Sequence, residues 1–393
     1  MSTVSAPNGR VLVACWTDLE TDPRVAREIA WLAAEGWTVD TVGFGATPGP
    51  AVRTHYAITD APVWSRNRAL LGLALAQPSM SLRFRLLMES RMPVDVRQLA
   101  LAGEYDLIFI NDLDFVPWAL GHTWPETVRF HLDLHEFEIP ELPPGTAYLP
   151  LMLPYKKWQW ARIGSPRFAT RSSVAGAIAN HYRDTFGIPR PAVVRNAPAY
   201  VEQSPTPVDP HHIRLIYHGH AAWARGLGVI IEAMALTDER FDLTLMLTGS
   251  AAVRDEAAAI VADTPRVRIV PPVPMSEVAR ALNQYDLEVM FFPPSTPGLK
   301  YALPNKLFEA VQGRLGLVSG ESPSMTEIIE QYGNGVVVSG WTAPDLAATI
   351  NDLTAERIRE LKDASIAAAA DLSAEAERAR FVASIDPQGQ RPE

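Results

Sequence analysis

The feature that most constrains the fold is an alternation of short apolar runs and amphipathic helical segments. Residues 11–16 and 38–44 are short apolar runs, and residues 25–34 between them carry apolar side chains at helical spacing. Apolar runs of this length are typical of buried strands, and a right-handed strand–helix–strand crossover makes the two strands parallel. The sequence therefore predicts an α/β protein built on parallel sheets.

The same alternation continues along both halves of the chain. In the first half we expect further strands at 105–111, 128–134, 176–179 and 192–195. In the second half we expect strands at 213–218, 243–248, 267–270, 287–292, 316–319 and 335–338, with helices between them and a mostly helical tail over 343–385. Two alternating halves predict two Rossmann-like parallel-sheet domains that face each other across a cleft.

A proline-rich linker, formed by residues 196–198 and then 203–210, marks the expected hinge between the halves. We place the first domain at 1–203 and the second at 204–372, with the C-terminal helix at about 373–393 returning to the first domain. A chain of 393 residues exceeds a single core of typical size, which agrees with two domains.

Composition excludes several classes of protein and of site. A net charge of −10 argues against nonspecific nucleic-acid binding, which needs a basic surface. The single cysteine, Cys15, permits neither an internal disulfide nor a metal site built from cysteines. Residues 1–10 lack the apolar core of a signal peptide, and no apolar run reaches the ~20 residues of a membrane span. We expect a cytoplasmic protein of undetermined oligomeric state.

Arginines and leucines alternate over residues 62–100 in a pattern that predicts helices. A basic amphipathic surface of this kind can bind anionic lipid at the inner face of a membrane. The alternative is that the helices pack on the sheet and leave their arginines in solvent. Sequence alone leaves both open.

Polar side chains follow three predicted strands of the first half. Asp18 lies in the loop after the first strand, Asn111, Asp112 and Asp114 end another, and His135 and Glu136 end a third. Ligands of open α/β sheets bind beyond the carboxyl ends of the strands. We therefore take Asp18, Asp112, Asp114, His135 and Glu136 as candidates for a ligand-binding site.

A loop-to-helix transition in the second half joins a cation and a carboxylate. Pro304 suits the start of a helix, and Lys306 and Glu309, three positions apart, project from its first turns. Free N–H groups at such a start attract an anion. Lys306 would add charge for a phosphate, and Glu309 could accept hydrogen bonds from sugar hydroxyls. The alternative is an ordinary amphipathic helix with both side chains in solvent.

Four segments together resemble the retaining glycosyltransferases of the GT-B fold, specifically family 4 (glycosyl transferases group 1). They are 22–39 (DPRVAREIAWLAAEGWTV), 133–136 (DLHE), 219–226 (GHAAWARG) and 303–309 (LPNKLFE). The resemblance implies a sugar-nucleotide donor bound by the second domain and an acceptor bound by the first. It implies catalytic roles for His135, Arg225, Lys306 and Glu309. It implies donor contacts from Gly219, His220, Arg225, Gly249, Val273, Pro274, Leu299, Lys300, Tyr301, Ala302, Leu303, Asn305, Lys306 and Glu309.

Two positions depart from the family pattern. His220 stands where the family has an arginine, five residues before Arg225, and Tyr301 stands where it has a second glutamate, eight residues before Glu309. Backbone N–H groups of the loop 298–302 could replace that glutamate toward the sugar. Asn196 could shape the cleft.

The resemblance implies transfer to a hydroxyl of a small-molecule, glycan or lipid-linked acceptor with retention of configuration. Departing phosphate would help to deprotonate the acceptor, so no protein nucleophile is assigned. No Asp-x-Asp pair precedes a donor-site strand, which predicts metal independence and no cofactor beyond the nucleotide sugar. Two alternatives stay open: a nucleotide-sugar epimerase of the same fold, and a non-catalytic partner subunit that binds sugar nucleotides.

Overall fold

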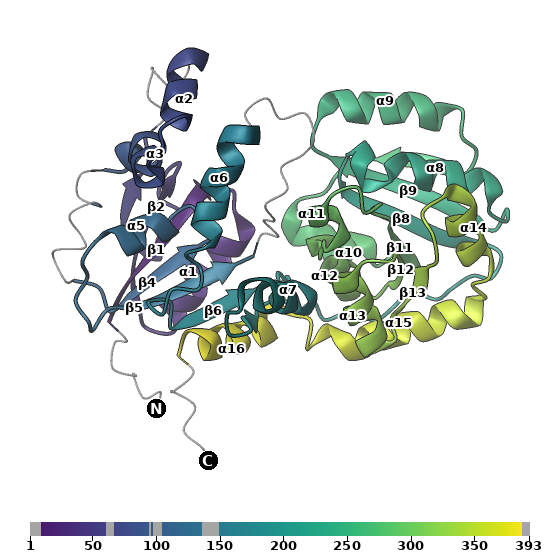
Figure 1. Cartoon of the computed structure of the whole chain (residues 1–393). Helices are drawn as coiled ribbons and strands as arrows, with labels where there is room; N and C mark the ends of the chain where they lie inside the picture. The colour runs from purple at the N-terminus through teal and green to yellow at the C-terminus, as the bar shows by residue number, and fades with distance from the viewer. Residues whose placement is uncertain (1–8, 60–66, 94–95, 97–103, 136–148, 387–393) are drawn as a thin grey trace, which may run out of the picture. The chain divides into compact units, whose positions relative to one another are not determined.

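The computed structural model describes residues 9–59, 67–93, 96, 104–135 and 149–386 (Figure 1). The chain divides into two compact units. The first comprises Met1–Val174, Ala179–Val194 and Arg380–Glu393, and the second comprises Ala175–Ile178 and Arg195–Ala379. The proline-rich segment 203–210 lies within the second unit.

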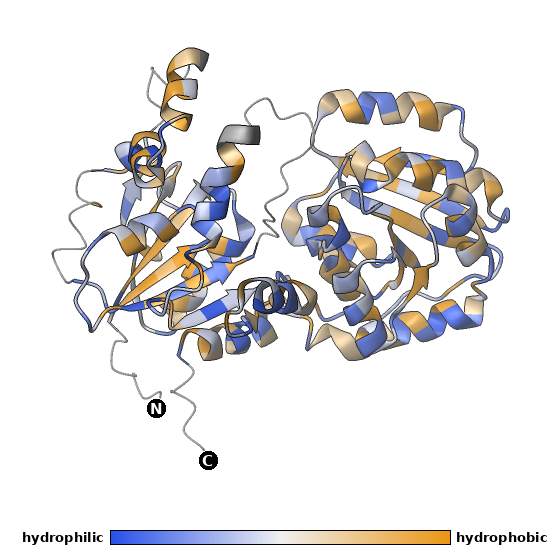
Figure 2. Ribbon diagram, in the orientation of Figure 1, coloured by the Kyte–Doolittle hydropathy of each residue, from blue (hydrophilic) through white to orange (hydrophobic). Residues whose placement is uncertain are grey.

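In its described residues the first unit holds a seven-stranded parallel sheet with the strand order β3-β2-β1-β4-β5-β6-β7. The bounds are β1 Arg10–Asp18, β2 Thr38–Phe44, β3 Val52–Ala57, β4 Leu107–Asn111, β5 Arg129–Leu134, β6 Thr170–Ser173 and β7 Ala192–Val193. Its central strands are coloured as hydrophobic in Figure 2, as expected for strands covered on both faces.

Helices on one face of this sheet complete a hydrophobic core. Val25 and Ile29 of α1 and Phe381 of α16 pack with Phe109 of β4. The helical segments from the N-terminus to α7, followed by the C-terminal helix, are α1 Pro23–Ala34, α2 Arg68–Leu75, α3 Met80–Leu87, η2 Glu89–Arg91, α5 Val116–Gly121, α6 Leu149–Trp160, α7 Gly176–Phe186 and α16 Ala374–Ile385.

One predicted strand of the first half is wrong. Residues 176–179 begin helix α7, and the strand is β6, Thr170–Ser173. The sequence of β6 is polar, so a search for apolar runs misses it. Its polar groups are nevertheless buried and hydrogen-bonded: Arg171 donates to the carbonyl of Ile163, and Ser173 to that of Leu134.

The second unit, in its described residues, has a six-stranded parallel sheet with the order β10-β9-β8-β11-β12-β13. The strands are β8 Ile213–His220, β9 Phe241–Thr248, β10 Val267–Val270, β11 Leu287–Met290, β12 Gly316–Gly320 and β13 Gly335–Val338. The sheet order reverses direction between β8 and β11, which places a binding crevice at the carboxyl ends of these two strands.

Helices alternate with these strands as predicted. They are η3 Trp223–Arg225, α8 Leu227–Ala233, η4 Met234–Leu236, α9 Ala251–Ala262, η5 Met275–Glu277, α10 Val278–Leu282, α11 Pro297–Lys300, α12 Asn305–Gln312, α13 Pro323–Tyr332, α14 Ala343–Asn351 and α15 Ala355–Ala369. Helix α12 packs with α10 and α15, and α8 with α14. No helix among the described residues is long and apolar enough to cross a membrane.

Candidate functional site

Lys306 is the most unusual charge in the second unit. It lies in the first turn of α12, is 5% exposed, and its ammonium makes no hydrogen bond within the described part of the chain. Nζ lies 3.4 Å from the centroid of the Tyr217 ring, a cation–π contact at the end of β8. A buried ammonium with three unused donors is costly unless an anion completes it.

Arg225 is the second cation of this region. Its guanidinium lies 5.8 Å from the Phe292 ring, which Lys306 also approaches from 5.6 Å. Gly226 follows with φ of 73°, and a Cβ there would lie 1.9 Å from the carbonyl oxygen of Phe291. Glycine is therefore required at 226, because no other residue lets η3 pass this close to the end of β11.

A buried histidine joins Glu309 to the sheet. His218 of β8 contacts Glu288 of β11 through Nδ1 at 2.8 Å and Glu309 through Nε2 at 2.9 Å. Burial opposes its charge, but the two carboxylates prevail and raise the pKa of His218 to about 9. His218 is thus an imidazolium near neutral pH, with both N–H groups donating to carboxylates.

For Lys306, unlike His218, the effect of burial on the pKa outweighs that of the nearby carboxylates. Burial lowers the pKa of the ammonium to about 8, against the opposing effect of Glu288. Nearby Arg225 adds to the lowering, and nearby Glu309 opposes it. The side chain is still charged at neutral pH. Its lowered pKa shows that the contacts it makes do not offset the cost of burying its charge.

The other predicted donor residues lie around the same edge. Gly219 has φ of 104° beside Lys306, and His220 is exposed, with its ring against Gly249 after β9. Val273 and Pro274 lie in the loop between β10 and η5. The amide oxygen of Asn305 accepts from Asn196 at 2.6 Å, so Asn196 fixes the start of α12.

The segment 297–303 is not the open loop that the sequence suggested. Pro297–Lys300 forms one helical turn, α11, capped by the Thr296 side chain, and the N–H groups of Leu299, Lys300, Tyr301 and Ala302 all have acceptors within residues 296–299. These four N–H groups are therefore already hydrogen-bonded in this structure, and their predicted use for sugar hydroxyls stays a prediction. The carbonyls of Tyr301 and Ala302 accept from Ser324 and Ser322, which fasten the turn to α13, and Leu303 is buried behind it.

In the first unit the structure brings two of the predicted residues together. His135, directly after β5, contacts Asp112, directly after β4, at 3.2 Å. Its other nitrogen contacts Asp133 at 2.8 Å, and Arg24 of α1 binds Asp133 in turn. Asp112 has φ of 61°, a left-handed conformation that is strained for a non-glycine residue.

The remaining residues proposed for the acceptor side are Asp18, Asp114 and Glu136. Asp18 is exposed at the end of β1, and Asp114 lies within 3.8 Å of Lys156. Asn111 is fully buried, and its amide has no hydrogen bond within the described residues. Glu136 lies outside the described residues.

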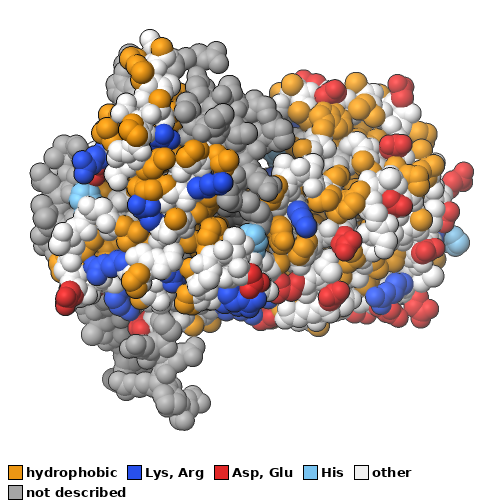
Figure 3. Space-filling model, in the orientation of Figure 1, with side chains coloured by type: hydrophobic (Ala, Val, Ile, Leu, Met, Phe, Trp, Pro, Cys, Tyr) orange, Lys and Arg blue, Asp and Glu red, His pale blue; other side chains and the backbone are white. Residues whose placement is uncertain are grey.

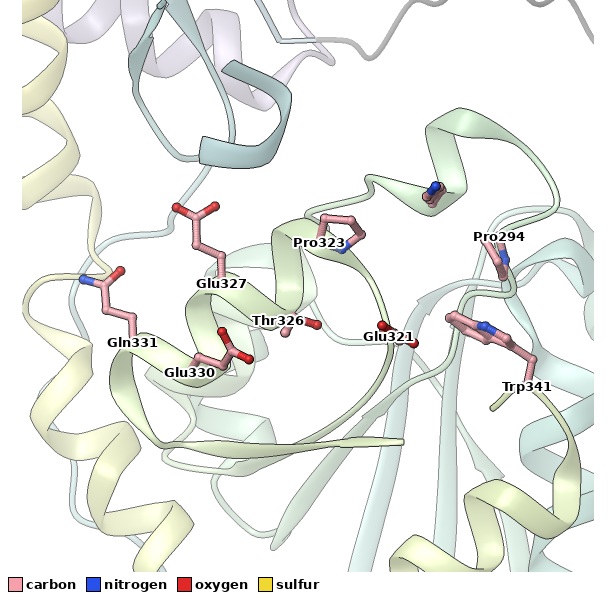
Figure 4. Close-up of a pocket in the computed structure, with 9 residues that line it drawn as sticks. Pro294, Glu321, Pro323, Thr326, Glu327, Glu330, Gln331 and Trp341 are labelled. Atoms are coloured by element: carbon pink, nitrogen blue, oxygen red, sulfur yellow. The ribbon is translucent and has the colours of Figure 1, made fainter. Parts of the chain in front are cut away.

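A separate pocket of about 700 Å³ opens beside α13 (Figure 4). It is lined by Pro294, Lys300, Glu321, Pro323, Thr326, Glu327, Glu330, Gln331 and Trp341. Trp341 packs on Phe291, and a Cβ at Gly320 would lie 2.3 Å from its ring, so the aromatic wall is fixed. The pocket shares only Lys300 with the predicted donor set.

Sequence reasoning missed His218, Glu288 and Tyr217. One signal was available: Glu288 is a carboxylate inside the apolar run 287–292, and a charge at such a position requires a partner. His218 falls directly before Gly219, at the end of another buried run. No cluster of three or more His, Cys, Asp or Glu suited to a metal ion occurs among the residues that the structure describes.

Comparisons with known proteins agree with this geometry. Residues 212–356 match the family model for glycosyl transferases group 1. A sequence search of curated proteins found no match.

Among solved structures, HepE from Anabaena, determined with UDP-glucose, is similar with a TM-score of 0.63 and 14% identity, covering 97% of this chain and 100% of that one. Sucrose-phosphate synthase from Thermosynechococcus elongatus is similar with a TM-score of 0.62 and 14% identity, covering 96% of this chain and 95% of that one. A Listeria monocytogenes protein assigned as a UDP-N-acetylglucosamine 2-epimerase gives 0.58 and 12%, covering 98% of each chain. Residues 212–356 thus match the glycosyl transferases group 1 family, and the chain as a whole has the GT-B fold.

Proposed function

We propose that the protein transfers a sugar from a nucleoside diphosphate sugar to a hydroxyl of an acceptor, with retention of configuration. The observation that carries this proposal is the buried ammonium of Lys306, which makes no hydrogen bond to any residue that the structure describes. A phosphate oxygen would supply the missing acceptor. Arg225 nearby supplies a second charge suited to paired phosphate oxygens. We assign the donor to the second unit and the acceptor to the first.

In this mechanism Lys306 and Arg225 stabilise the negative charge that grows on the diphosphate as the bond to the sugar breaks. Donors fixed in advance around developing charge are usually the largest catalytic contribution. Glu309, anchored by His218, accepts hydrogen bonds from the ribose. The departing phosphate takes the proton of the acceptor hydroxyl, so the protein provides no nucleophile and the reaction proceeds without a metal ion.

The test begins with a thermal-shift and hydrolysis screen of nucleotide sugars. Arg225→Ala and Glu309→Ala should each abolish turnover of the selected donor. Arg240→Ala is the matched control, since Arg240 also lies over a phenylalanine, 4.6 Å from the Phe241 ring, but at the opposite end of the sheet. Full activity in both Arg225→Ala and Glu309→Ala would refute the proposal.

Two other activities are separated by the same assay. An epimerase, favoured only by the similarity to the Listeria protein, would convert the donor without any acceptor. A non-catalytic partner subunit is favoured by His220 and Tyr301, the departures from the family pattern. It would bind donor without turnover until another protein is added.

We further propose that the protein lies at a membrane surface through α2 and α3, in keeping with a cytoplasmic location. Leu70, Leu73 and Leu82 are 42%, 62% and 39% exposed on these helices, and Arg85 beside them is exposed. The upper left of Figure 3 shows the apolar surface over α2. Leu73→Asp should reduce co-sedimentation with anionic vesicles, whereas Leu236→Asp, at a site 50% exposed in the second unit, should not.

A further inference from the structure

A row of alternating charges, hereafter the charge chain, joins Arg24, Asp133, His135 and Asp112 in the first unit. It begins at Arg24, which is 5% exposed and donates two parallel hydrogen bonds to Asp133, from Nε at 2.8 Å and Nη2 at 2.7 Å. Its third donor, Nη1, reaches the carbonyl of Val194 at 2.8 Å. The guanidinium is therefore held at three points, and it fixes the plane of the Asp133 carboxylate.

The charge chain continues from Asp133 through His135 to Asp112. Asp133 accepts from His135 Nδ1 at 2.8 Å and from Ser172 at 2.5 Å, while His135 Nε2 faces Asp112 at 3.2 Å. Burial opposes a charge on the ring, but Asp112 and Asp133 prevail and raise the pKa of His135 to about 10. Both ring nitrogens consequently carry protons: Nδ1 donates to Asp133, and Nε2 forms an ion pair with Asp112.

Exposure decides which end of the charge chain meets a substrate. Side-chain exposure is 0% at Asp133, 5% at Arg24, 11% at His135 and 15% at Asp112. Asp112 is thus the outermost member, at the carboxyl end of β4, where the strand order of the first sheet reverses. Its backbone is left-handed, a conformation that is uncommon outside glycine, best tolerated by asparagine and aspartate, and often found at functional sites.

We propose that Asp112 binds a substrate hydroxyl through its carboxylate, and that Arg24, Asp133 and His135 are positioning residues that hold it. This inference rests on the proposed function, and it assigns a hydroxyl-bearing acceptor to this carboxylate. It also gives a role to the Asp-Pro-Arg segment at 22–24. Pro23 and the Asp22 cap begin α1, and the next residue, Arg24, reaches Asp133.

Glu28 is the titratable group nearest to Arg24 in this cluster, at 3.1 Å, and Asp22, Cys15 and His131 also interact electrostatically with its members. Burial raises its pKa to about 8, so Glu28 is mostly protonated at neutral pH and leaves Arg24 to Asp133. With Glu28 neutral, the guanidinium of Arg24 and the imidazolium of His135 each contact a carboxylate, that of Asp133 and that of Asp112. The outermost member is a carboxylate, which repels an anion and suits a hydroxyl that donates to it.

The first experiment reads the charge chain without any activity. Histidine NMR should find the pKa of His135 near 10 in the wild-type protein and clearly lower in Asp112→Asn, which removes one carboxylate but suits the same backbone. Arg24→Lys should weaken the low-field Nδ1 proton signal of His135. Arg171→Lys is the control, because Arg171 is a buried arginine that binds backbone carbonyls. A pKa of His135 near 6.5, or a pKa that does not change in Asp112→Asn, would refute the proposal that His135 is held between Asp133 and Asp112.

The second experiment measures transfer from the donor that the screen selects, with glycerol and water as hydroxyl probes. Asp112→Asn should lower kcat roughly 10- to 100-fold and Arg24→Lys roughly 10-fold, while KM for the donor and binding of UDP stay unchanged. Wild-type kcat in Asp112→Asn, measured per folded protein, would overturn the role of Asp112. Absence of UDP binding by the wild-type protein would instead refute the proposed function. The NMR result would still decide whether Arg24, Asp133, His135 and Asp112 form the proposed row of ion pairs.

Discussion

Replacing Lys306 by methionine should make the protein more stable and unable to bind a nucleotide. Methionine keeps most of the side-chain volume and removes a cation that has no hydrogen bond in the described structure. The fall in the pKa of Lys306 from 10.5 to about 8 corresponds to about 3 kcal/mol of stability lost at neutral pH. The contact with Tyr217 offsets part of this cost, so the expected gain in Lys306→Met is about 1–3 kcal/mol.

The sign of the pH dependence follows from the depressed pKa. A lysine whose pKa is lower in the folded state destabilises the fold below pH 8, and this penalty fades as the pH rises toward 10.5. The advantage of Lys306→Met over the wild-type protein should therefore be largest at neutral pH and shrink above pH 8. Urea unfolding at pH 7 and pH 10, read by hydrogen exchange on peptides from the second unit, measures this difference.

Lys362→Met is the matched control in the same unit. Lys362 is equally buried, but its ammonium donates to Asp286 at 2.9 Å, to the carbonyl of Tyr285 at 3.1 Å and to Thr206 at 3.2 Å. Removing it leaves a buried carboxylate with fewer partners, so Lys362→Met should destabilise the protein while UDP still binds. Calorimetry with UDP should find binding lost only in Lys306→Met. Equal destabilisation in both variants would refute the reasoning that Lys306 is retained for a ligand.

Three further predictions concern the same region. Glu288→Gln should lower the pKa of His218 from about 9. A raised histidine pKa stabilises the fold fully below pH 6.5 and no longer above pH 9, so the variant should be less stable than the wild-type protein at pH 6 and similarly stable at pH 9.5. An equal loss of stability at both pH values would contradict this prediction. Gly226→Ala should cost more stability and donor affinity than Gly333→Ala, since both glycines have left-handed φ but only a Cβ at 226 meets the backbone of Phe291. Chelation with EDTA should leave sugar transfer unchanged, and loss of turnover that added Mg²⁺ restores would overturn the metal-independent mechanism.

The sequence predicted the fold well because buried parallel strands are apolar on both faces and therefore stand out as short runs. It failed at β6, whose buried polar side chains form hydrogen bonds that no pattern of apolar residues reveals. It also failed at α11, because a single helical turn has too little periodicity to be distinguished from a loop. The general position of Lys306 and Glu309 was predictable from the proline before them and the strand before that.

The contacts within the site were harder to predict, since they join residues that are distant in sequence. His218 and Glu309 are separated by 91 positions, and Arg24 and Asp133 by 109. Nothing in the local sequence at Glu309 indicates that a histidine holds its carboxylate. Only the parallel pairing of β8 with β11 brings Glu288 next to His218 and so makes the three residues one cluster.

The balance of charge in the two clusters argues for different ligands. In the second unit, the cations Lys306, Arg225 and His218 face the carboxylates of Glu288 and Glu309, so three positive charges meet two negative ones. The surplus resides on Lys306, the member without a hydrogen bond within the described chain, and a diphosphate would neutralise it. In the first unit each carboxylate of the cluster contacts a cation, Asp133 with Arg24 and Asp112 with His135. The outermost group there is the carboxylate of Asp112, and a neutral hydroxyl, which can donate to a carboxylate, is the ligand that it favours.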